Sequence, residues 1–272
     1  MTAVTPTVAR AAAAALVDVR RAGRYWLLRV RAPEIVRQAQ PGQFVSVGVE
    51  APHTLLRRPF AIAGVDPEGS AFDVVVAVVG SGSAWLASQH PGRALDVVGP
   101  LGKGFAVPSA PVRCVLVGGG YGTAALEWLA RRLLRGGHGV ELFSGAATAA
   151  ALYPVARAAG DGPGLRLFET TEDGSRGTTG LVTAALAERL EHPAKVFACG
   201  PMPMLAAVAD IARRRGCDCQ VAVEEHMGCS VGVCMTCVVP TADGYVRACI
   251  EGPVLSAERI DWESVRRRTH RG

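Results

Sequence analysis

Apolar and polar positions alternate over short distances in the first hundred or so residues of the chain. Short apolar runs rich in branched side chains are bounded there by Gly and Pro, as is typical of β-strands. We expect strands at residues 15–20, 25–33, 42–50, 58–65, 72–80 and 94–100. A single short helix is expected among them, at residues 83–90. This pattern predicts a closed, six-stranded antiparallel β-barrel, which we assign to residues 1–110.

The pattern changes between residues 111 and 222, where apolar strands alternate with segments of helical periodicity. Strands are predicted at residues 112–120, 138–145, 164–170, 194–200 and 219–225, and helices at 123–137, 180–190 and 201–216. Such alternation predicts an α/β domain whose parallel sheet is covered by helices on both faces. The last part, residues 223–272, is rich in cysteine and turn residues and too short for a core of its own. We expect it to form a small third domain.

Composition narrows the class of protein. Of the 272 residues 49% are hydrophobic and 19% charged, which is typical of a globular protein. The net charge is only +5, and no basic stripe is interleaved with aromatic residues, so nucleic-acid binding is not expected. The alanine run near the N-terminus passes directly into a strand, and no stretch approaches the ~18 to 20 apolar residues of a membrane span. We therefore expect a cytoplasmic enzyme, in which the eight cysteines do not form disulfides.

Four cysteines near the C-terminus have the spacing C-x4-C-x2-C-x11-C, at Cys229, Cys234, Cys237 and Cys249. Structural zinc sites usually take their ligands from two short knuckles, whereas one loop with three cysteines and a distant fourth is the plant-type [2Fe–2S] arrangement. Gly228 and Gly232 suit a loop that wraps a cluster, because glycine accepts positive φ angles. The spacing favours an iron–sulfur cluster, with zinc and disulfide or redox chemistry as alternatives.

The other cysteines differ in setting. Cys114 lies inside a predicted buried strand and is expected to be part of the core. Cys217 and Cys219 flank the start of another strand and have no evident partners. Cys199 lies near the end of the predicted strand 194–200, in the segment "FACGPMPM".

Two glycine-rich turns are candidate phosphate sites. The segment "VLVGGGYGTAAL" (residues 115–126) joins a strand to a helix, where backbone N–H groups can approach a pyrophosphate. It lacks strict G-x-G-x-x-G spacing, so a tight turn that binds nothing is the alternative. No Arg or Lys in residues 143–154 suits a 2′-phosphate, which favours NAD(H) over NADP(H). In the barrel, Arg57 or Arg58 and the Gly–Ser turn that follows at residues 80–83 could hold a diphosphate.

The order of these motifs along the chain resembles that of a known group of proteins. The segments are "RRPFAIAG", "VVGSGSAWL", "DVVGPLGKGF", "GGGYGTAAL", "TEDGSRGTTGLVT", "ACGPMPMLAAV" and "VEEHMGCSVGVCMTCVVP", with "ACIEGPV" last. In this order they resemble the ferredoxin reductase-like flavoproteins over essentially the whole chain. Within that group they are most similar to the family of electron transfer subunits of dihydroorotate dehydrogenases.

The resemblance implies three cofactor sites. FAD would lie against the barrel, with Arg58 near its phosphates; the implied residues are Arg58, Pro59, Phe60, Ala61, Val75, Val76, Ala77, Gly82 and Ser83. NAD(H) would bind in the α/β domain, with Cys199 near the nicotinamide; the implied residues are Gly118, Gly119, Gly120, Gly122, Thr123, Cys199, Gly200 and Pro201. The [2Fe–2S] cluster would take Cys229, Cys234, Cys237 and Cys249. No residue is assigned as an acid, base or nucleophile.

The resemblance also implies a partner: an FMN-containing dihydroorotate dehydrogenase catalytic subunit, in a heterotetramer with two copies of each chain. Electrons would pass from FMN through the cluster and FAD to NAD⁺ in pyrimidine biosynthesis. Apolar residues around the cluster loop would either contact that partner or shield the cluster: Met227, Val231, Val233 and Met235. One alternative is a related reductase subunit serving another oxidoreductase or a hydrogenase. A second is a non-enzymatic, zinc-bearing binding protein.

Two residues depart from the family pattern. Ala61 replaces the Ser or Thr that many relatives carry, so a hydroxyl that could hydrogen-bond the flavin edge is lost. Tyr121 replaces a small aliphatic residue within the glycine turn, where its ring would narrow the nucleotide site or stack in it.

Overall fold

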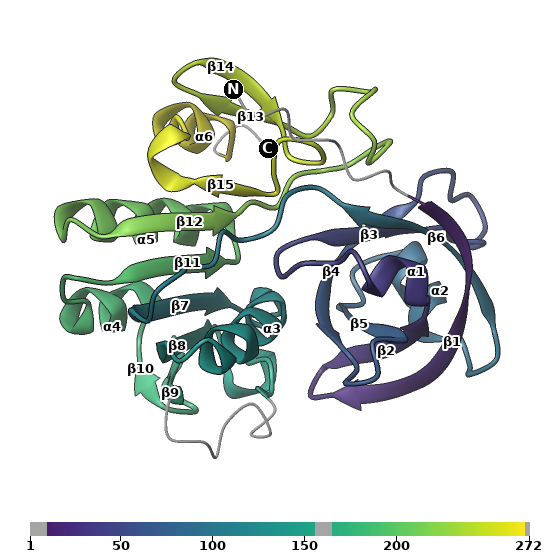
Figure 1. The fold of residues 1–272 in the computed structure, drawn as a ribbon, viewed down its shortest axis with the longest axis horizontal. Coiled ribbons are helices and arrows are strands. Elements are labelled where there is room, and N and C mark those ends of the chain that lie inside the picture. The colour runs from purple at the N-terminus through teal and green to yellow at the C-terminus, as the bar shows by residue number, and fades with distance from the viewer. Residues whose placement is uncertain (1–9, 156–164, 270–272) are drawn as a thin grey trace.

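The computed structural model of the protein describes residues 10–155 and 165–269. Figure 1 shows a β-barrel, an α/β unit beside it, and a C-terminal region that lies along one edge of the α/β unit. Among the described residues, no helix combines the length and the apolar character needed to cross a membrane.

The barrel is closed and antiparallel throughout, in the strand order β1-β2-β5-β4-β3-β6, as the sequence predicted. Its strands are β1 (Arg10–Ala22), β2 (Tyr25–Arg31), β3 (Phe44–Val47), β4 (Arg58–Val65), β5 (Ala71–Val76) and β6 (Ala94–Leu101). Two short helices, α1 (Pro33–Val36) and α2 (Ser81–Ala87), connect them, so the expectation of a single helix, which corresponds to α2, is wrong. The alanine run belongs to β1, where Ala14 and Leu16 are buried while Ala13 and Ala15 are exposed, as the two-residue period of a strand requires.

The α/β unit contains a seven-stranded sheet in the order β10-β9-β8-β7-β11-β12-β15. Six of its strands run parallel: β7 (Arg113–Gly119), β8 (Gly139–Ala146), β9 (Leu165–Thr171), β10 (Thr178–Thr179), β11 (Lys195–Cys199) and β12 (Asp218–Ala222). The helices are α3 (Gly122–Arg135), α4 (Val182–Arg189) and α5 (Met202–Arg214), with a short turn η1 (Ala149–Ala151). Alternate residues of β7 face opposite layers: Leu116 packs with α3, and Val117 with α4 and α5. Helices therefore cover both faces of the sheet, as predicted.

The C-terminal region shares its core with the α/β unit. It consists of β13 (Val238–Thr241), β14 (Gly244–Arg247), β15 (Val254–Ser256), η3 (Ala257–Arg259) and α6 (Trp262–Thr269). β15 pairs antiparallel with β12 and so extends the large sheet. Cys237, Val239 and Ala248 belong to the same buried cluster as α5 and the sheet. This explains how a segment too short for its own core is held in place.

Candidate functional site

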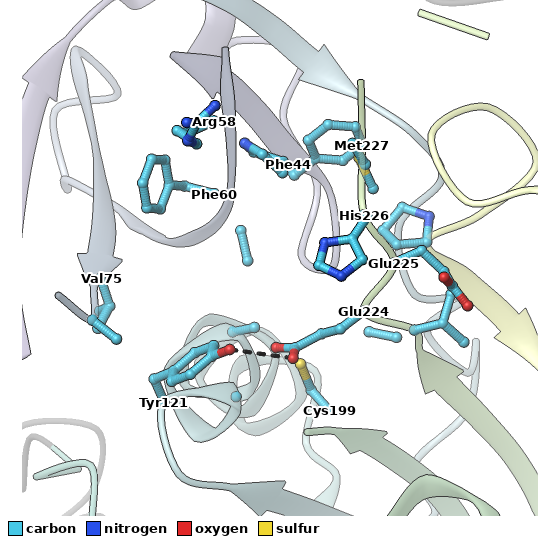
Figure 2. Close-up of a pocket in the computed structure, with 18 of the residues that line it drawn as sticks. Phe44, Arg58, Phe60, Val75, Tyr121, Cys199, Glu224, Glu225, His226 and Met227 are labelled. Carbon is cyan, nitrogen blue, oxygen red and sulfur yellow. Dashed lines mark hydrogen bonds between the residues drawn. The ribbon is translucent and has the colours of Figure 1, made fainter. Parts of the chain in front are cut away.

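A cavity of about 850 Å³ opens where the barrel, the α/β unit and the C-terminal region meet (Figure 2). Its volume is in the range of sites that hold small molecules and cofactors. One wall comes from β4, β5 and the start of α2, and the opposite wall from the turns after β7 and β11 and the segment after β12. Figure 2 shows Arg58, Phe60 and Val75 on the barrel side, facing Tyr121, Cys199 and Glu224 across the cavity.

Most of the residues that the sequence assigned to FAD are on the barrel wall. The cavity is lined by Arg58, Pro59, Phe60, Ala61, Val75, Ala77, Gly82 and Ser83. Val76 is fully buried and packs inside the barrel, because side chains alternate along β5. The wall is mostly apolar, and Ala61 contributes no hydroxyl to it.

The two neighbouring arginines have different surroundings. Arg58 lines the cavity, and its Nη1 donates to the Leu56 carbonyl at 2.7 Å. A Cβ at Gly82 would lie 2.9 Å from Nε of Arg58, so glycine lets the guanidinium rest on the first turn of α2. Arg57 instead forms an ion pair with Asp96 on β6. Of the two, Arg58 is therefore the one placed to meet a phosphate in the cavity.

The turns after β7 and β11 form part of the cavity wall opposite the barrel. These strands are adjacent in the sheet, and the two turns are pressed together. A Cβ at Gly122 would lie 2.6 Å from the Cys199 carbonyl oxygen, and one at Gly119 would lie 2.8 Å from the Pro201 ring. Close approach of two backbones therefore explains these glycines.

Of the residues assigned to NAD(H), Gly122 and Cys199 line the cavity. Thr123 is fully buried beneath the turn, where its hydroxyl lies 3.2 Å from that of Ser144. The others lie at the same edge of the sheet: Gly118 and Gly119 end β7, Gly120 follows it, and Gly200 and Pro201 follow β11. The carboxyl edge of a parallel sheet is where such domains bind nucleotides.

Three polar side chains meet on this wall. The Tyr121 hydroxyl donates to Oε2 of Glu224 at 3.3 Å. The Glu224 side chain is exposed to the cavity, yet the protein around it raises the pKa of its carboxyl, an effect that the Tyr121 hydrogen bond opposes. Burial, reinforced by the Glu224 carboxylate, raises the pKa of Cys199, which therefore remains a neutral thiol at neutral pH. Burial and the same carboxylate raise the pKa of Tyr121 to about 12.

The cluster loop, residues 228–237, turns its backbone toward its own sulfurs. The N–H groups of Val233 and Cys234 donate to Sγ of Cys229, at 3.2 and 3.4 Å. The N–H of Cys229 and the hydroxyl of Thr236 donate to Sγ of Cys234 at 3.4 and 3.1 Å. Hydrogen bonds from Thr236 and Cys229 lower the pKa of Cys234 to about 6. These bonds favour thiolates, the form that binds iron.

The four thiols form two pairs. Cys229 and Cys234 share the backbone contacts above, and Cys249, which enters from the turn after β14, lies close enough to Cys237 for that thiol to raise its pKa. Burial and Cys237 raise the pKa of Cys249 to about 12. In the described part of the chain, no three His, Cys, Asp or Glu side chains are grouped to hold a single metal ion. Two pairs of thiols fit a two-iron cluster, in which each iron takes two protein ligands.

The backbone of the cluster loop differs in part from expectation. Gly232 has φ +82°, as expected, and its Cβ position would lie 2.6 Å from Ile250. The expectation of positive φ at Gly228 is wrong: positive φ occurs instead at Ser230 (62°) and Met235 (59°). The reason for glycine at residue 228 is space, because a Cβ there would lie 3.2 Å from Sγ of Cys234.

Sequence reasoning missed much of the nucleotide-side wall. The predicted strand 219–225 ends at Ala222, and the chain from Glu224 to Met227 then runs along the cavity. Further lining residues come from distant segments: Gly42, Phe44, Met202, Pro253 and Arg268. An acidic residue just past the carboxyl end of a parallel strand was the available signal for Glu224.

The remaining cysteines match their expected settings. Cys114 is fully buried in β7, as predicted for a core residue. Cys217 and Cys219 are also buried, beside a smaller cavity of about 240 Å³ between α5 and α6. None of the eight cysteines forms a disulfide.

Comparison with known proteins agrees with this geometry. Residues 224–261 match the family model of the iron–sulfur cluster binding domain of dihydroorotate dehydrogenase B. The electron transfer subunit of dihydroorotate dehydrogenase B (NAD(+)) from Geobacillus thermodenitrificans (strain NG80-2) is 37% identical over 245 residues, covering 88% of this chain and 93% of that protein. The corresponding subunit from Bacillus caldolyticus is 39% identical over 227 residues, covering 81% and 86%.

Solved structures agree with the fold. A chain of an NADH-dependent reduced ferredoxin-NADP oxidoreductase, a structure described for flavin-based electron bifurcation, aligns with a TM-score of 0.84 at 29% identity. That alignment covers 96% of this chain and 94% of the other. The ferredoxin reductase in carbazole 1,9a-dioxygenase shares the fold with a TM-score of 0.68 at 21% identity, over 78% and 68% of the two chains. On its sequence relatives and its cluster domain, the chain belongs to the family of electron transfer subunits of dihydroorotate dehydrogenase B.

Proposed function

We propose that the protein passes electrons between a dihydroorotate-oxidising partner chain and NAD⁺, through a [2Fe–2S] cluster and FAD. One observation carries this proposal: the segment that begins at Glu224 lines the cavity and reaches the first cluster cysteine, Cys229, five residues later. Five residues span at most about 18 Å, so the cavity and the cluster loop are direct neighbours. The two sites can therefore act in series.

The residues present fit these groups. Arg58 and the apolar wall of β4 and β5 would hold FAD, the packed turns after β7 and β11 would hold NAD(H), and the four cysteines would bind the cluster. When bound, the cluster supplies one-electron transfer and FAD supplies the link between single electrons and a hydride, chemistry that side chains cannot provide. The domain assignments 1–110, 111–222 and 223–272 follow the same division of roles.

The side chains of the cavity would position the cofactors and shield them from water. The apolar barrel wall keeps water from one face of the cavity, and the neutral Cys199 thiol adds no charge to the other. Burial raises the pKa of the Glu224 carboxyl, and the hydrogen bond from Tyr121 opposes that shift.

The cluster loop would face the catalytic partner. Val231, Val233 and Met235 are 47%, 79% and 53% exposed, an apolar group at the tip of the loop, while Met227 is partly buried beside the cavity. We place an FMN-containing dihydroorotate dehydrogenase subunit on this tip, in an assembly of two copies of each chain. The eight unpaired cysteines suit the reducing environment of the cytoplasm.

Two measurements test the proposal. An anaerobic titration of the holoprotein with NADH is expected to bleach the flavin and produce the electron paramagnetic resonance signal of a reduced [2Fe–2S] cluster. Co-expression with candidate catalytic subunits is expected to give dihydroorotate-dependent reduction of NAD⁺. A colourless preparation that contains zinc would contradict the proposal and leave a zinc-bearing binding protein.

Substitution of Met235 tests the partner surface. The change Met235→Lys places a charge at the loop tip and is expected to weaken association with the catalytic subunit by ~10-fold or more, without loss of iron. Leu181→Lys is the control, because Leu181 is equally exposed (58%) but lies at the start of α4. Unchanged co-purification of the Met235→Lys chain would show that the loop tip is not the interface.

A second function is favoured by one comparison. The NADH-dependent reduced ferredoxin-NADP oxidoreductase chain matches nearly the whole length of this protein. A chain of this architecture can therefore serve a different oxidoreductase. If co-expressed dihydroorotate dehydrogenase subunits gave no NAD⁺ reduction while NADH still reduced the flavin and cluster, this second function would replace the first.

A further inference from the structure

Tyr121 is the one large side chain in a turn otherwise built of glycine. The turn cannot shift freely, because the space for a Cβ at Gly122 is filled by the Cys199 carbonyl. Gly120, with φ +53°, bends the chain just before Tyr121. The phenol is therefore held at the edge of the cavity, where its side chain is 43% exposed.

Tyr121 connects the three parts of the molecule. It belongs to the α/β unit, and its ring lies edge-on to Tyr25 of the barrel, with centroids 6.2 Å apart and planes at 72°. Tyr25 is itself fixed, since its hydroxyl donates to the Ala151 carbonyl at 2.6 Å. The Tyr121 hydroxyl reaches Glu224, in the segment that leads to the cluster loop. The ring is thus held by the barrel through Tyr25, and its hydroxyl by the segment that leads to the cluster loop.

A nicotinamide must approach the flavin from this side. The proposed flavin site lies along β4 and β5, and the turns proposed for NAD(H) lie across the cavity from it, with Tyr121 among them (Figure 2). Resting on the proposed function, we infer that Tyr121 is the positioning residue that controls nicotinamide access: its ring and its bond to Glu224 close this wall and give way when NAD(H) binds.

Closure of this kind has a measurable consequence. NAD(H) must replace the hydrogen bond to Glu224 and the edge contact with Tyr25, so the closed wall lowers the affinity for the nucleotide. One hydrogen bond corresponds to ~2- to 10-fold in affinity, and one edge-on aromatic contact to a similar factor.

The test compares two substitutions in the oxidised holoprotein. Tyr121→Phe keeps the ring and removes the bond to Glu224; Tyr121→Ile removes the ring as well and restores a small aliphatic residue. The Kd for NAD⁺ is measured without turnover, from the shift of flavin absorption. We expect a Kd lower by ~2- to 10-fold for Tyr121→Phe, and lower still for Tyr121→Ile.

Tyr153→Phe is the matched control. Its hydroxyl also donates to a carboxylate, Oε2 of Glu127 at 3.1 Å, but the ring is buried outside the cavity. That variant is expected to leave the Kd for NAD⁺ unchanged. A Kd that stays the same or rises in both Tyr121 variants, with flavin content intact, overturns the inference while the wild-type response to NAD⁺ still supports the proposed function. A wild-type holoprotein whose flavin does not respond to NAD⁺ or NADH overturns both.

Discussion

The cluster loop and the cavity are neighbours, but the chain builds them in different ways. All four cluster cysteines lie within residues 229–249, and three lie within nine residues. The cavity, in contrast, is lined by residues from Gly42 to Arg268, drawn from all three parts of the fold. The first site is local in sequence and the second exists only after the parts have packed together. A change in one should therefore leave the other largely intact.

Loss of a cluster ligand tests this independence most severely. Cys234→Ser removes an exposed thiol whose pKa the loop lowers to about 6. Since even outer-shell partners of metal ligands are worth ~10- to 100-fold, we expect electron transfer to the partner to fall by at least ~100-fold. Iron content measures the loss of the cluster, and the flavin and its reduction by NADH should remain. Cys217→Ser is the control: Cys217 lies outside the cluster loop, so this variant of the protein should retain its iron. Loss of both flavin and iron from the Cys234→Ser variant would show that the two sites are not independent.

Removal of Arg58 is the complementary change on the cavity side. Hydrogen bonds to charged groups are worth about 1.5–3 kcal/mol, so Arg58→Ala is expected to weaken FAD binding by ~10- to 100-fold. Fluorescence titration of the apoprotein with FAD measures this, while the iron content should not change. Arg57→Ala is the control, because Arg57 pairs with Asp96 at a partly exposed position and should alter FAD affinity by less than ~3-fold. Equal losses in the two variants would contradict the assignment of Arg58.

The cavity also depends on the close packing of the turns after β7 and β11 against each other. Gly122→Ala places a methyl group 2.6 Å from the Cys199 carbonyl and should cost about 1–3 kcal/mol of unfolding free energy. We expect weaker NAD⁺ binding in the same variant, because the turns must separate. Gly139→Ala, whose Cβ would meet no atom within 4 Å, should change stability by no more than about 0.5 kcal/mol. Urea unfolding of the three proteins measures both effects, and similar stabilities would show that the turns can yield freely.

The smallest expected effect is on pH dependence. Burial raises the pKa of Glu127 on α3, although Arg131 and Tyr153 oppose this. A raised pKa means that its contribution to stability is complete below about pH 4.5, its unfolded value, and is lost as the pH rises through the folded value. The junction of α3 with the barrel should therefore weaken toward neutral pH, and Glu127→Gln should remove that part of the decline.

Glu141 supplies a control of opposite sign. Burial alone would raise its pKa, but hydrogen bonds from Arg113 and Arg166 lower it overall. Its stabilising effect is present above its unfolded value of about 4.5 and is lost as the pH falls through the folded value. Urea unfolding between about pH 3 and 8 should show two different effects on the free energy of unfolding. Glu141→Gln should change it at pH values below about 4.5, and Glu127→Gln at pH values above about 4.5. A change in the same pH range in both variants would contradict the assigned directions.

Much of the fold could be predicted because its signals are periodic. Alternation with a period of two marked the barrel strands, and the switch to helical spacing marked the α/β unit. Strand β15 could not be predicted, since three residues carry no periodic signal and are held by pairing with β12. The end of β12 was placed too late because the apolar run continues through Val223 while the pairing stops at Ala222.

The sequence by itself determined the spacing of the cluster cysteines, the glycine turns and the order of the three parts, because each is a local pattern read within a few residues. Only the tertiary structure decided that Arg58 rather than Arg57 faces the cavity, that Val76 points into the barrel, and that Tyr121 meets Glu224. Those outcomes depend on which side chains remain uncovered once the barrel, sheet and C-terminal region pack. Long-range packing of this kind leaves no periodic trace in the sequence.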